Sequence, residues 1–132
     1  MIGLDTNVIV RYIAQDDEVQ SAEAARIFEK EISRTNKGFI SSIALCETLW
    51  VLGRGYKQPK AKLLEVVSML LEIDNIELEH RDCVWSAYCD WEEGRADFSD
   101  YFLARIGKQV GCEWTYTFDQ NAQLHRFFRQ PE

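Results

Sequence analysis

MIGLDTNVIV, residues 1–10, contains a short apolar run that stops abruptly at the polar turn Asp5-Thr6-Asn7. This pattern predicts a buried strand that leads through the turn into a helix starting near Val8. Further strands are expected at residues 38–41, 76–78 and 114–118. Because helical segments separate these strands and no hairpin signal occurs, we expect an α/β fold with a mostly parallel sheet.

The helical segments have recognisable ends. Pro59 is a typical first residue of a helix, Gly94 a typical terminator, and Asp97 a typical N-cap. The expected helices are residues 21–32, 41–53, 59–72, 82–93, 97–110 and 121–128. The chain of 132 residues has the usual size of one domain, and it shows no repeat or linker composition. We therefore expect a single domain over residues 1–132.

The net charge of −7 argues against general, charge-driven binding to nucleic acid, which usually requires a basic face. A cluster of acids that binds cations is an exception to this argument, because the bound metal ions neutralise the negative charge of the cluster. Between Glu47 and Glu65 there is no acid, and four cations form a local basic patch: Arg54, Lys57, Lys60 and Lys62. This patch is compatible with a phosphate backbone and equally with a solvated turn between helices.

The longest uncharged stretch, residues 38–46, is far shorter than the roughly 20 residues of a membrane span. Residues 1–10 lack a basic leader, so we expect a cytoplasmic protein with no membrane partner. No two cysteines form a C-x-x-C pair, and we expect buried free thiols at Cys46, Cys83, Cys89 and Cys112.

Two aspartates directly follow strands. Asp5 follows the first expected strand and Asp119 the last. Ligands of open α/β sheets bind outside the carboxyl ends of strands, so both positions suit chemistry. Asp5 is equally suited to cap the following helix, and turn chemistry alone could place Asp119.

Glu47 falls inside the apolar stripe of its expected helix, which comprises Ile43, Cys46, Trp50 and Val51. The stripe predicts that Glu47 faces the core, where a carboxylate needs a salt bridge, a proton or a bound cation.

Asp100 shares a helix face with Leu103 and Ala104 and lies in the first turn, where the helix dipole favours negative charge. Four acids thus occupy positions that are unusual for surface acids: Asp5, Glu47, Asp100 and Asp119. Gathered carboxylates repel one another, and Mg²⁺ or Mn²⁺ relieves this repulsion while leaving room for water and a phosphate. Such a site supports attack of water on a phosphodiester.

Four segments resemble one known family in order and spacing: Asp5-Thr6-Asn7, Glu47, ADFSDYFLA at residues 96–104, and TFDQNA at residues 117–122. Together they resemble the PIN domain, and within it most closely the VapC-type toxin ribonucleases of type II toxin–antitoxin systems. The resemblance implies a three-layer α/β/α fold with a small, mostly parallel central sheet of four to five strands. Family members often finish with a further short strand, whereas this chain stops soon after residue 128.

The resemblance also implies Mg²⁺- or Mn²⁺-dependent hydrolysis of RNA, usually by a homodimer that a cognate antitoxin protein blocks. By this likeness Asp5 and Asp100 are metal ligands, Glu47 ligates a metal or orients a water, and Asp119 supports a metal. Three further residues are expected around these acids: Thr6 and Thr117 as hydrogen-bond partners of carboxylates, and Asp97 mainly as a helix cap. Members of the family often have an RNA-facing rim at the position of the basic patch, which comprises Arg54, Lys57, Lys60 and Lys62.

Three alternatives remain open. The domain could be a catalytically silent module that binds RNA or a protein, or a PIN nuclease in RNA processing. It could also cleave DNA, because the same metal chemistry acts on either polymer and nothing in the sequence reads a 2′-hydroxyl. The four intact acids favour an enzyme over a binding module.

Overall fold

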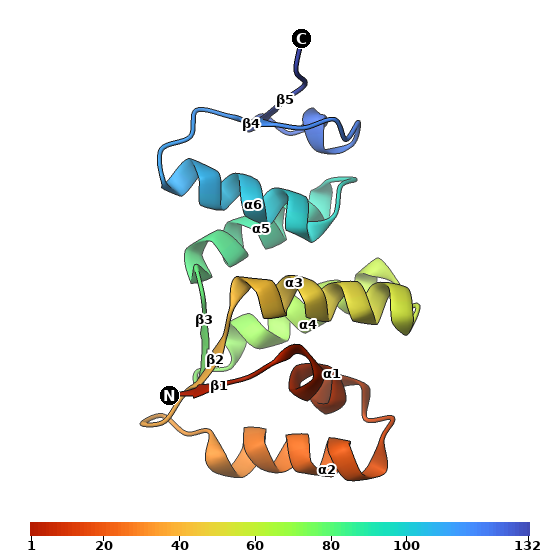
Figure 1. Cartoon of the computed structure of the whole chain (residues 1–132), viewed down its shortest axis with the longest axis vertical. Helices are drawn as coiled ribbons and strands as arrows, with labels where there is room; N and C mark the ends of the chain where they lie inside the picture. Colours follow the sequence, from red (N-terminus) through yellow and green to blue (C-terminus); the bar gives the residue numbers. More distant parts are fainter. The chain divides into compact units, whose positions relative to one another are not determined.

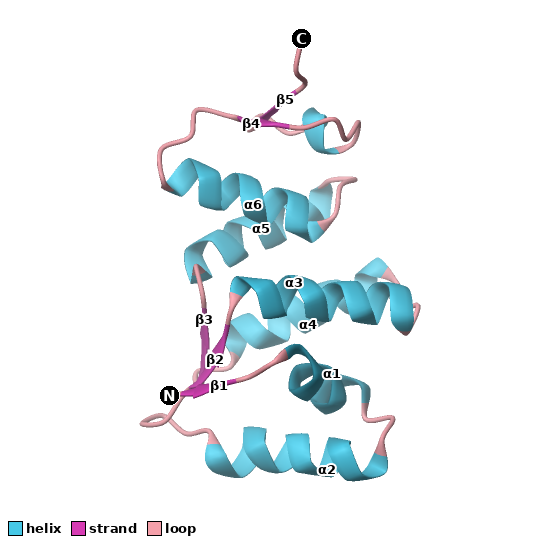
Figure 2. Cartoon of the chain, in the orientation of Figure 1, coloured by secondary structure: helices cyan, strands magenta, loops and turns pink.

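The computed structural model describes residues 1–132 as two compact units, Met1–Glu79 and His80–Glu132, which we describe separately (Figure 1). Six α-helices and five short strands alternate along the chain, and every strand pair is parallel (Figure 2). The predicted α/β class and the parallel strand direction are therefore confirmed. No helix combines the length and hydropathy that a membrane-spanning segment needs.

The first unit is built on a three-stranded parallel sheet. Its strands β1 (Ile2–Gly3), β2 (Gly38–Ile40) and β3 (Ile76–Leu78) lie side by side in that order (Figure 1). Its helices are α1 (Thr6–Ala14), α2 (Glu18–Arg26), α3 (Ser42–Trp50) and α4 (Lys60–Glu72). The π-helical turns η1 (Ile27–Glu31) and η2 (Val51–Gly55) extend α2 and α3. Its core consists of fully buried aliphatic residues from these elements, among them Ile9, Ile40, Leu45, Leu52 and Leu70.

Local sequence signals explain where these helices begin. Asp5 caps α1, and Ser41 caps α3 because its Oγ accepts a hydrogen bond from the N–H of Ala44 at 3.1 Å. Pro59, the predicted first residue of this helix, is the N-cap of α4, which begins one residue later. Strands β1 and β2 thus each lead directly into a helix cap, and both caps lie at the carboxyl ends of their strands.

The second unit consists of α5 (Arg81–Glu93), α6 (Phe98–Gln109) and a two-stranded parallel sheet. The sheet pairs β4 (Thr115–Tyr116) with β5 (Phe128–Arg129), and a single 3₁₀ turn, η3 (Ala122–Leu124), lies between them in sequence. Helices α5 and α6 pack against each other through a core that includes Val84, Ala87, Phe98, Phe102 and Ala104.

The end of the chain differs from the sequence-based expectation. A helix was predicted at residues 121–128, but only η3 forms there, and Phe128 and Arg129 build the strand β5. The Asp119 carboxylate holds the chain in a tight turn by accepting two backbone N–H groups, and Phe128 is buried as it pairs with Thr115. A final short strand, β5, is therefore present although the chain stops soon after residue 128. The five strands form a three-stranded and a two-stranded sheet rather than one.

The four cysteines are all free, as expected. Cys83 is buried and Cys46 is half-buried, and burial raises the pKa of both thiols. Cys89 and Cys112 are exposed, so the prediction of buried thiols is wrong for these two.

Replacing Gly94 with alanine should destabilise the second unit. A Cβ at this position would collide with the hydroxyl of Tyr101 and lie 2.9 Å from the carbonyl oxygen of Asp90. The Tyr101 hydroxyl accepts the N–H of Ala96 at 3.2 Å, so moving the ring also breaks this buried hydrogen bond. We expect Gly94→Ala to lower the free energy of unfolding by about 1–3 kcal/mol in a denaturant titration.

Gly55→Ala is the matched control for this prediction. A Cβ there meets only Val51 Cγ1 at an ordinary 3.8 Å, and the backbone is helical, so stability should stay unchanged or rise slightly. Equal stability of the two variants would contradict the tight fit of Tyr101 against Gly94.

Candidate functional site

Asp5 and Glu47 line one open groove of about 530 Å³ in the first unit. Asp5 follows β1, and Glu47 lies on α3, which begins directly after β2. Because β1 and β2 are parallel neighbours, their carboxyl ends bring Asp5 and the start of α3 to the same edge of the sheet. Asn7, Ser41 and Ile43 complete the walls of this groove around the two acids.

Asp5 is confirmed as the cap of α1, and one of its carboxylate oxygens faces no protein donor. Its Oδ1 caps α1 by accepting the N–H groups of Asn7 at 2.9 Å and Val8 at 3.4 Å. Its Oδ2 accepts no hydrogen bond, and the side chain is exposed at the groove. The cap fixes the orientation of the carboxylate, and the second oxygen remains available to a ligand.

The prediction that Glu47 faces the core is wrong. Glu47 is exposed, and its expected apolar neighbours are exposed with it, Ile43 at 77% and Trp50 at 61%. Helix α3 carries a second apolar stripe, and that stripe supplies its buried residues: Ala44, Leu45, Thr48 and Leu49. Glu47 makes no ion pair or hydrogen bond in the structure, so neither burial nor a salt bridge accounts for a carboxylate on this groove wall.

Asp100 lies half-buried in the first turn of α6. It forms a capping box with Asp97, in which Asp100 Oδ2 accepts the N–H of Asp97 at 3.2 Å. Burial raises the pKa of Asp100 above its ordinary value of 3.8, and the charges of Asp119 and Asp97 raise it further, against the hydrogen bond from Asp97, which lowers it. The predicted capping role of Asp97 is therefore confirmed, and burial disfavours the ionised form of Asp100.

Asp119 also uses one oxygen for the backbone and leaves the other open. Its Oδ1 accepts the N–H groups of Asn121 and Ala122, both at 2.8 Å. Thr117 Oγ1 accepts the backbone N–H of Asp119 at 3.0 Å, so Thr117 fixes the turn rather than the carboxylate itself. Thr6 is the first residue of α1 and lines the groove beside Asp5.

The donor chemistry of these residues fits a hard divalent cation. Asp5, Asp100 and Asp119 each hold one carboxylate oxygen on backbone N–H groups and present the other, and Glu47 presents both. Oxygen is the donor that Mg²⁺ and Mn²⁺ prefer, and a cation would offset the negative charges that add to the effect of burial on the pKa of Asp100. Neither unit gathers three or more Asp, Glu, His or Cys side chains into a metal-binding group of its own.

The four cations of the basic patch are all exposed, along a stretch that runs from η2 to the first turn of α4. Lys60 and Lys62 lie in the first turn of α4, which contains no acid, so the positive end of the helix dipole adds to their charge. Lys62 forms an exposed ion pair with Glu65 at 3.4 Å. The patch is therefore a solvated positive surface.

Sequence reasoning missed a cation beside Asp5. Arg11 and Asp5 line a second hollow of about 440 Å³, and Arg11 donates to Tyr56 Oη at 2.8 Å and to Gln20 Oε1 at 2.7 Å. The Tyr56 hydroxyl donates in turn to Asp16 at 2.7 Å and lowers the pKa of that carboxyl. These partners lie up to 45 residues apart in sequence, and no local pattern signals their contact.

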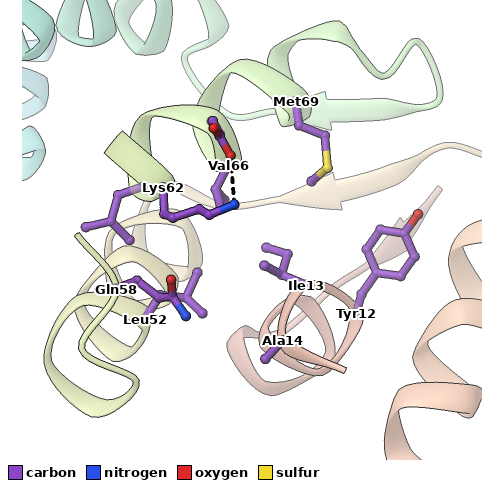
Figure 3. A pocket seen from close by; sticks show the side chains of 10 residues that line it. Tyr12, Ile13, Ala14, Leu52, Gln58, Lys62, Val66 and Met69 are labelled. Carbon is purple, nitrogen blue, oxygen red and sulfur yellow. Dashed lines mark hydrogen bonds and ion pairs between the residues drawn. The ribbon is translucent and has the colours of Figure 1, made fainter. Parts of the chain in front are cut away.

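A third cavity of about 560 Å³ is mainly apolar and contains none of the predicted acids. Figure 3 shows Tyr12, Ile13 and Ala14 of α1 on one side and Leu52 and Lys62 on the other. Its two charged residues are Lys62 and Glu65, which pair with each other. This cavity therefore lacks the groups needed for hydrolysis, and we place the candidate chemistry at the acids.

Comparison with known proteins gives one match. The family model described as the PIN domain matches residues 2–127. No curated protein matches the chain. The matched span contains all four candidate acids and reaches across both units.

Proposed function

The chain belongs to the PIN domain family, whose members are typically metal-dependent nucleases, and from this premise we propose that it is a Mg²⁺- or Mn²⁺-dependent endoribonuclease. One observation carries the proposal. Asp5, Asp100 and Asp119 each have one oxygen fixed by backbone N–H groups and one oxygen open. Carboxylates oriented in this way are prepared to ligate a cation without further ordering of their side chains.

In this proposal the four acids act as one set. Asp5 and Asp100 are the main ligands, Asp119 supports them, and Glu47 either ligates or orients a water through its unpaired carboxylate. A bound divalent cation supplies Lewis-acid activation of water and neutralises charge on the phosphate. Asp97 acts on this set through the cap that orients Asp100.

We propose RNA as the substrate and the basic patch as a contact for its backbone. The protein has a net charge of −7, and the patch supplies local positive charge that suits a phosphate backbone. Its residues are Arg54, Lys57, Lys60 and Lys62. By the same likeness we propose a VapC-type toxin that acts as a single-domain, cytoplasmic homodimer and is blocked by a cognate antitoxin. An acidic set that binds cations also offers a binding place for a basic side chain of such a partner.

The test is cleavage of an end-labelled single-stranded RNA by purified protein with Mg²⁺ or Mn²⁺. We expect fragments that appear with either ion and disappear with EDTA, and no fragments from single-stranded DNA of the same sequence. Equal cleavage of the DNA would overturn the assignment of RNA as the substrate. Intact RNA in the presence of both ions would favour a catalytically silent binding module instead.

A further inference from the structure

Four polar side chains of the first unit are joined by hydrogen bonds around Arg11. Tyr56 Oη accepts the Nη1–H of Arg11 at 2.8 Å and donates to Asp16 Oδ2 at 2.7 Å. Arg11 also donates to Asp16 Oδ1 at 3.3 Å and, from Nε, to Gln20 Oε1 at 2.7 Å. We call Arg11, Asp16, Gln20 and Tyr56 the Arg11 cluster. All four residues belong to Met1–Glu79, so the cluster is complete within one unit.

Tyr56 begins the segment that joins η2 to α4, residues 56–59, and the backbone of this segment is unusual. Lys57 has a φ of 55°, in the left-handed region that residues with a side chain seldom adopt. The N–H of Gln58 donates to the carbonyl of Leu52 at 3.0 Å and closes the end of η2, where glycine usually fits best. A lysine at this position accepts a conformational cost, which indicates a role for its side chain.

Two cations of the basic patch lie on either side of Tyr56. Arg54 comes two residues before Tyr56, and Lys57 directly follows it. Both cations are exposed, and neither forms an ion pair with a carboxylate. Because Tyr56 lies between them in the chain, holding its ring in place restricts the backbone from which both cations project.

The Arg11 cluster connects this part of the basic patch to the helix that Asp5 caps. Arg11 lies on α1, six residues after Asp5, which corresponds to about 9 Å along the helix axis at the usual rise per residue. Asp5 and Arg11 also line the same hollow of about 440 Å³. Since α1 is one continuous helix, the hydrogen bond from Arg11 to Tyr56 ties the backbone of the patch to the helix that carries a candidate metal ligand.

The hydrogen bond between Tyr56 and Asp16 persists at neutral pH. It raises the pKa of Tyr56 above its ordinary value of 10.0, so the hydroxyl keeps its proton and donates. The same bond lowers the pKa of Asp16 below 3.8, so the acceptor is a carboxylate. Both partners therefore hold the required protonation state wherever the enzyme would act.

We propose that Tyr56 and Arg11 are positioning residues, which hold Arg54 and Lys57 at a fixed place relative to Asp5. In this arrangement the two cations meet phosphates of the RNA while a phosphate further along the strand lies at the acids. This inference rests on the proposed ribonuclease function and adds to it the contacts that set the position of the basic patch. A fixed spacing between patch and acids lets binding of the strand also orient the phosphate to be cleaved.

Tyr56→Phe tests the inference, because it removes the hydroxyl without changing the charge. The anisotropy of a short fluorescein-labelled single-stranded RNA, measured in EDTA at several salt concentrations, gives Kd and its salt dependence without cleavage. We expect Kd to rise about 3- to 10-fold. The slope of log Kd against log salt concentration should fall by about 0.7 for each cation that no longer meets a phosphate.

Tyr12→Phe is the matched control. Tyr12 lies one residue from Arg11 on α1, its ring stacks on Phe28, and its hydroxyl forms no hydrogen bond. This variant should keep the wild-type Kd and slope. A second comparison uses a protein that carries Arg54→Gln and Lys57→Gln, in which adding Tyr56→Phe should leave Kd unchanged.

The outcomes distinguish this inference from the proposed function. If the wild type cleaves RNA and Tyr56→Phe keeps the wild-type Kd and slope, the positioning role is overturned and the nuclease stands. If Tyr56→Phe weakens binding with a smaller slope but the wild type never cleaves RNA, the positioning role stands and the nuclease fails. A full effect of Tyr56→Phe in the protein without the two cations would show that the hydroxyl does not act through the patch, and would overturn the inference. A wild type that binds no RNA would overturn both.

Discussion

Asp100→Asn should lower metal-dependent RNA cleavage by at least about 100-fold while leaving the protein folded. Loss of a group that merely supports a metal ligand typically costs 10- to 100-fold, so loss of a ligand oxygen should cost more. Asparagine keeps the shape of the side chain and a carbonyl oxygen that can accept the N–H of Asp97. The initial rate on labelled single-stranded RNA at saturating Mg²⁺ measures the effect.

The stability of the same variant shows whether the loss comes from misfolding. Burial and neighbouring acids raise the pKa of Asp100, so its ionised form destabilises the folded state as the pH rises above the ordinary value of 3.8. Without metal at neutral pH, Asp100→Asn should therefore melt at or above the wild-type temperature.

Asp97→Asn is the matched control for this change. It alters the other member of the capping box, keeps a side chain that caps helices well, and should retain most of the cleavage activity. Equal rates for Asp100→Asn and the wild type would remove Asp100 from the proposed set.

Arg105→Ala should clearly destabilise the second unit. Arg105 donates to both carboxylate oxygens of Asp90, at 2.7 Å and 2.8 Å, and connects α6 to α5. The side chains of Arg105 and Asp90 are only 21% and 12% exposed. Removing one partner of a buried pair costs about 3–5 kcal/mol, and we expect about 2–4 kcal/mol here because water still reaches part of the pair.

The effect should depend on pH in a defined direction. Burial opposes ionisation of Asp90, but the hydrogen bond from Arg105 and the nearby His125 outweigh it and lower the pKa of Asp90 below 3.8. The pair therefore contributes its full stability above pH 3.8 and loses it as the pH falls through the lower folded-state pKa. Denaturant titrations should show a difference between wild type and variant that is constant near neutral pH and shrinks in acid.

Two further variants separate the buried pair from general effects of charge. Arg26→Ala breaks exposed pairs with Glu23 and Glu31 and should change stability little. The double variant Asp90→Leu/Arg105→Met removes both charges and should recover much of the loss. A loss for Arg105→Ala no larger than that for Arg26→Ala would contradict the structural role of the buried pair.

Local signals in the sequence predicted most element boundaries. Pro59, Gly94 and Asp97 act through their own backbone or through residues three positions away, and each lies where the sequence placed it. Asp5 is a further example, because one side chain serves as a cap while its other oxygen stays free. Such features depend on short sequence distances, so they can be inferred from the residues alone.

Features that depend on tertiary contacts could not be predicted in this way. Helix α3 is apolar on two faces, and only packing in the fold decides that the Leu45 face is buried and the Glu47 face exposed. The last expected helix failed because Phe128 gains a strand partner thirteen residues away, at Thr115. The pairing of Asp90 with Arg105 bridges two helices, and neither residue stands out in its own segment.

The central proposal is that Asp5 and Asp100 are both metal ligands. Titration of Mn²⁺ into the metal-free wild type, Asp5→Asn and Asp100→Asn, followed by the electron paramagnetic resonance signal of free Mn²⁺, tests it most directly. We predict that the wild type binds Mn²⁺ and that each single variant loses most of this affinity. Wild-type affinity in either single variant would contradict the role of that aspartate as a metal ligand.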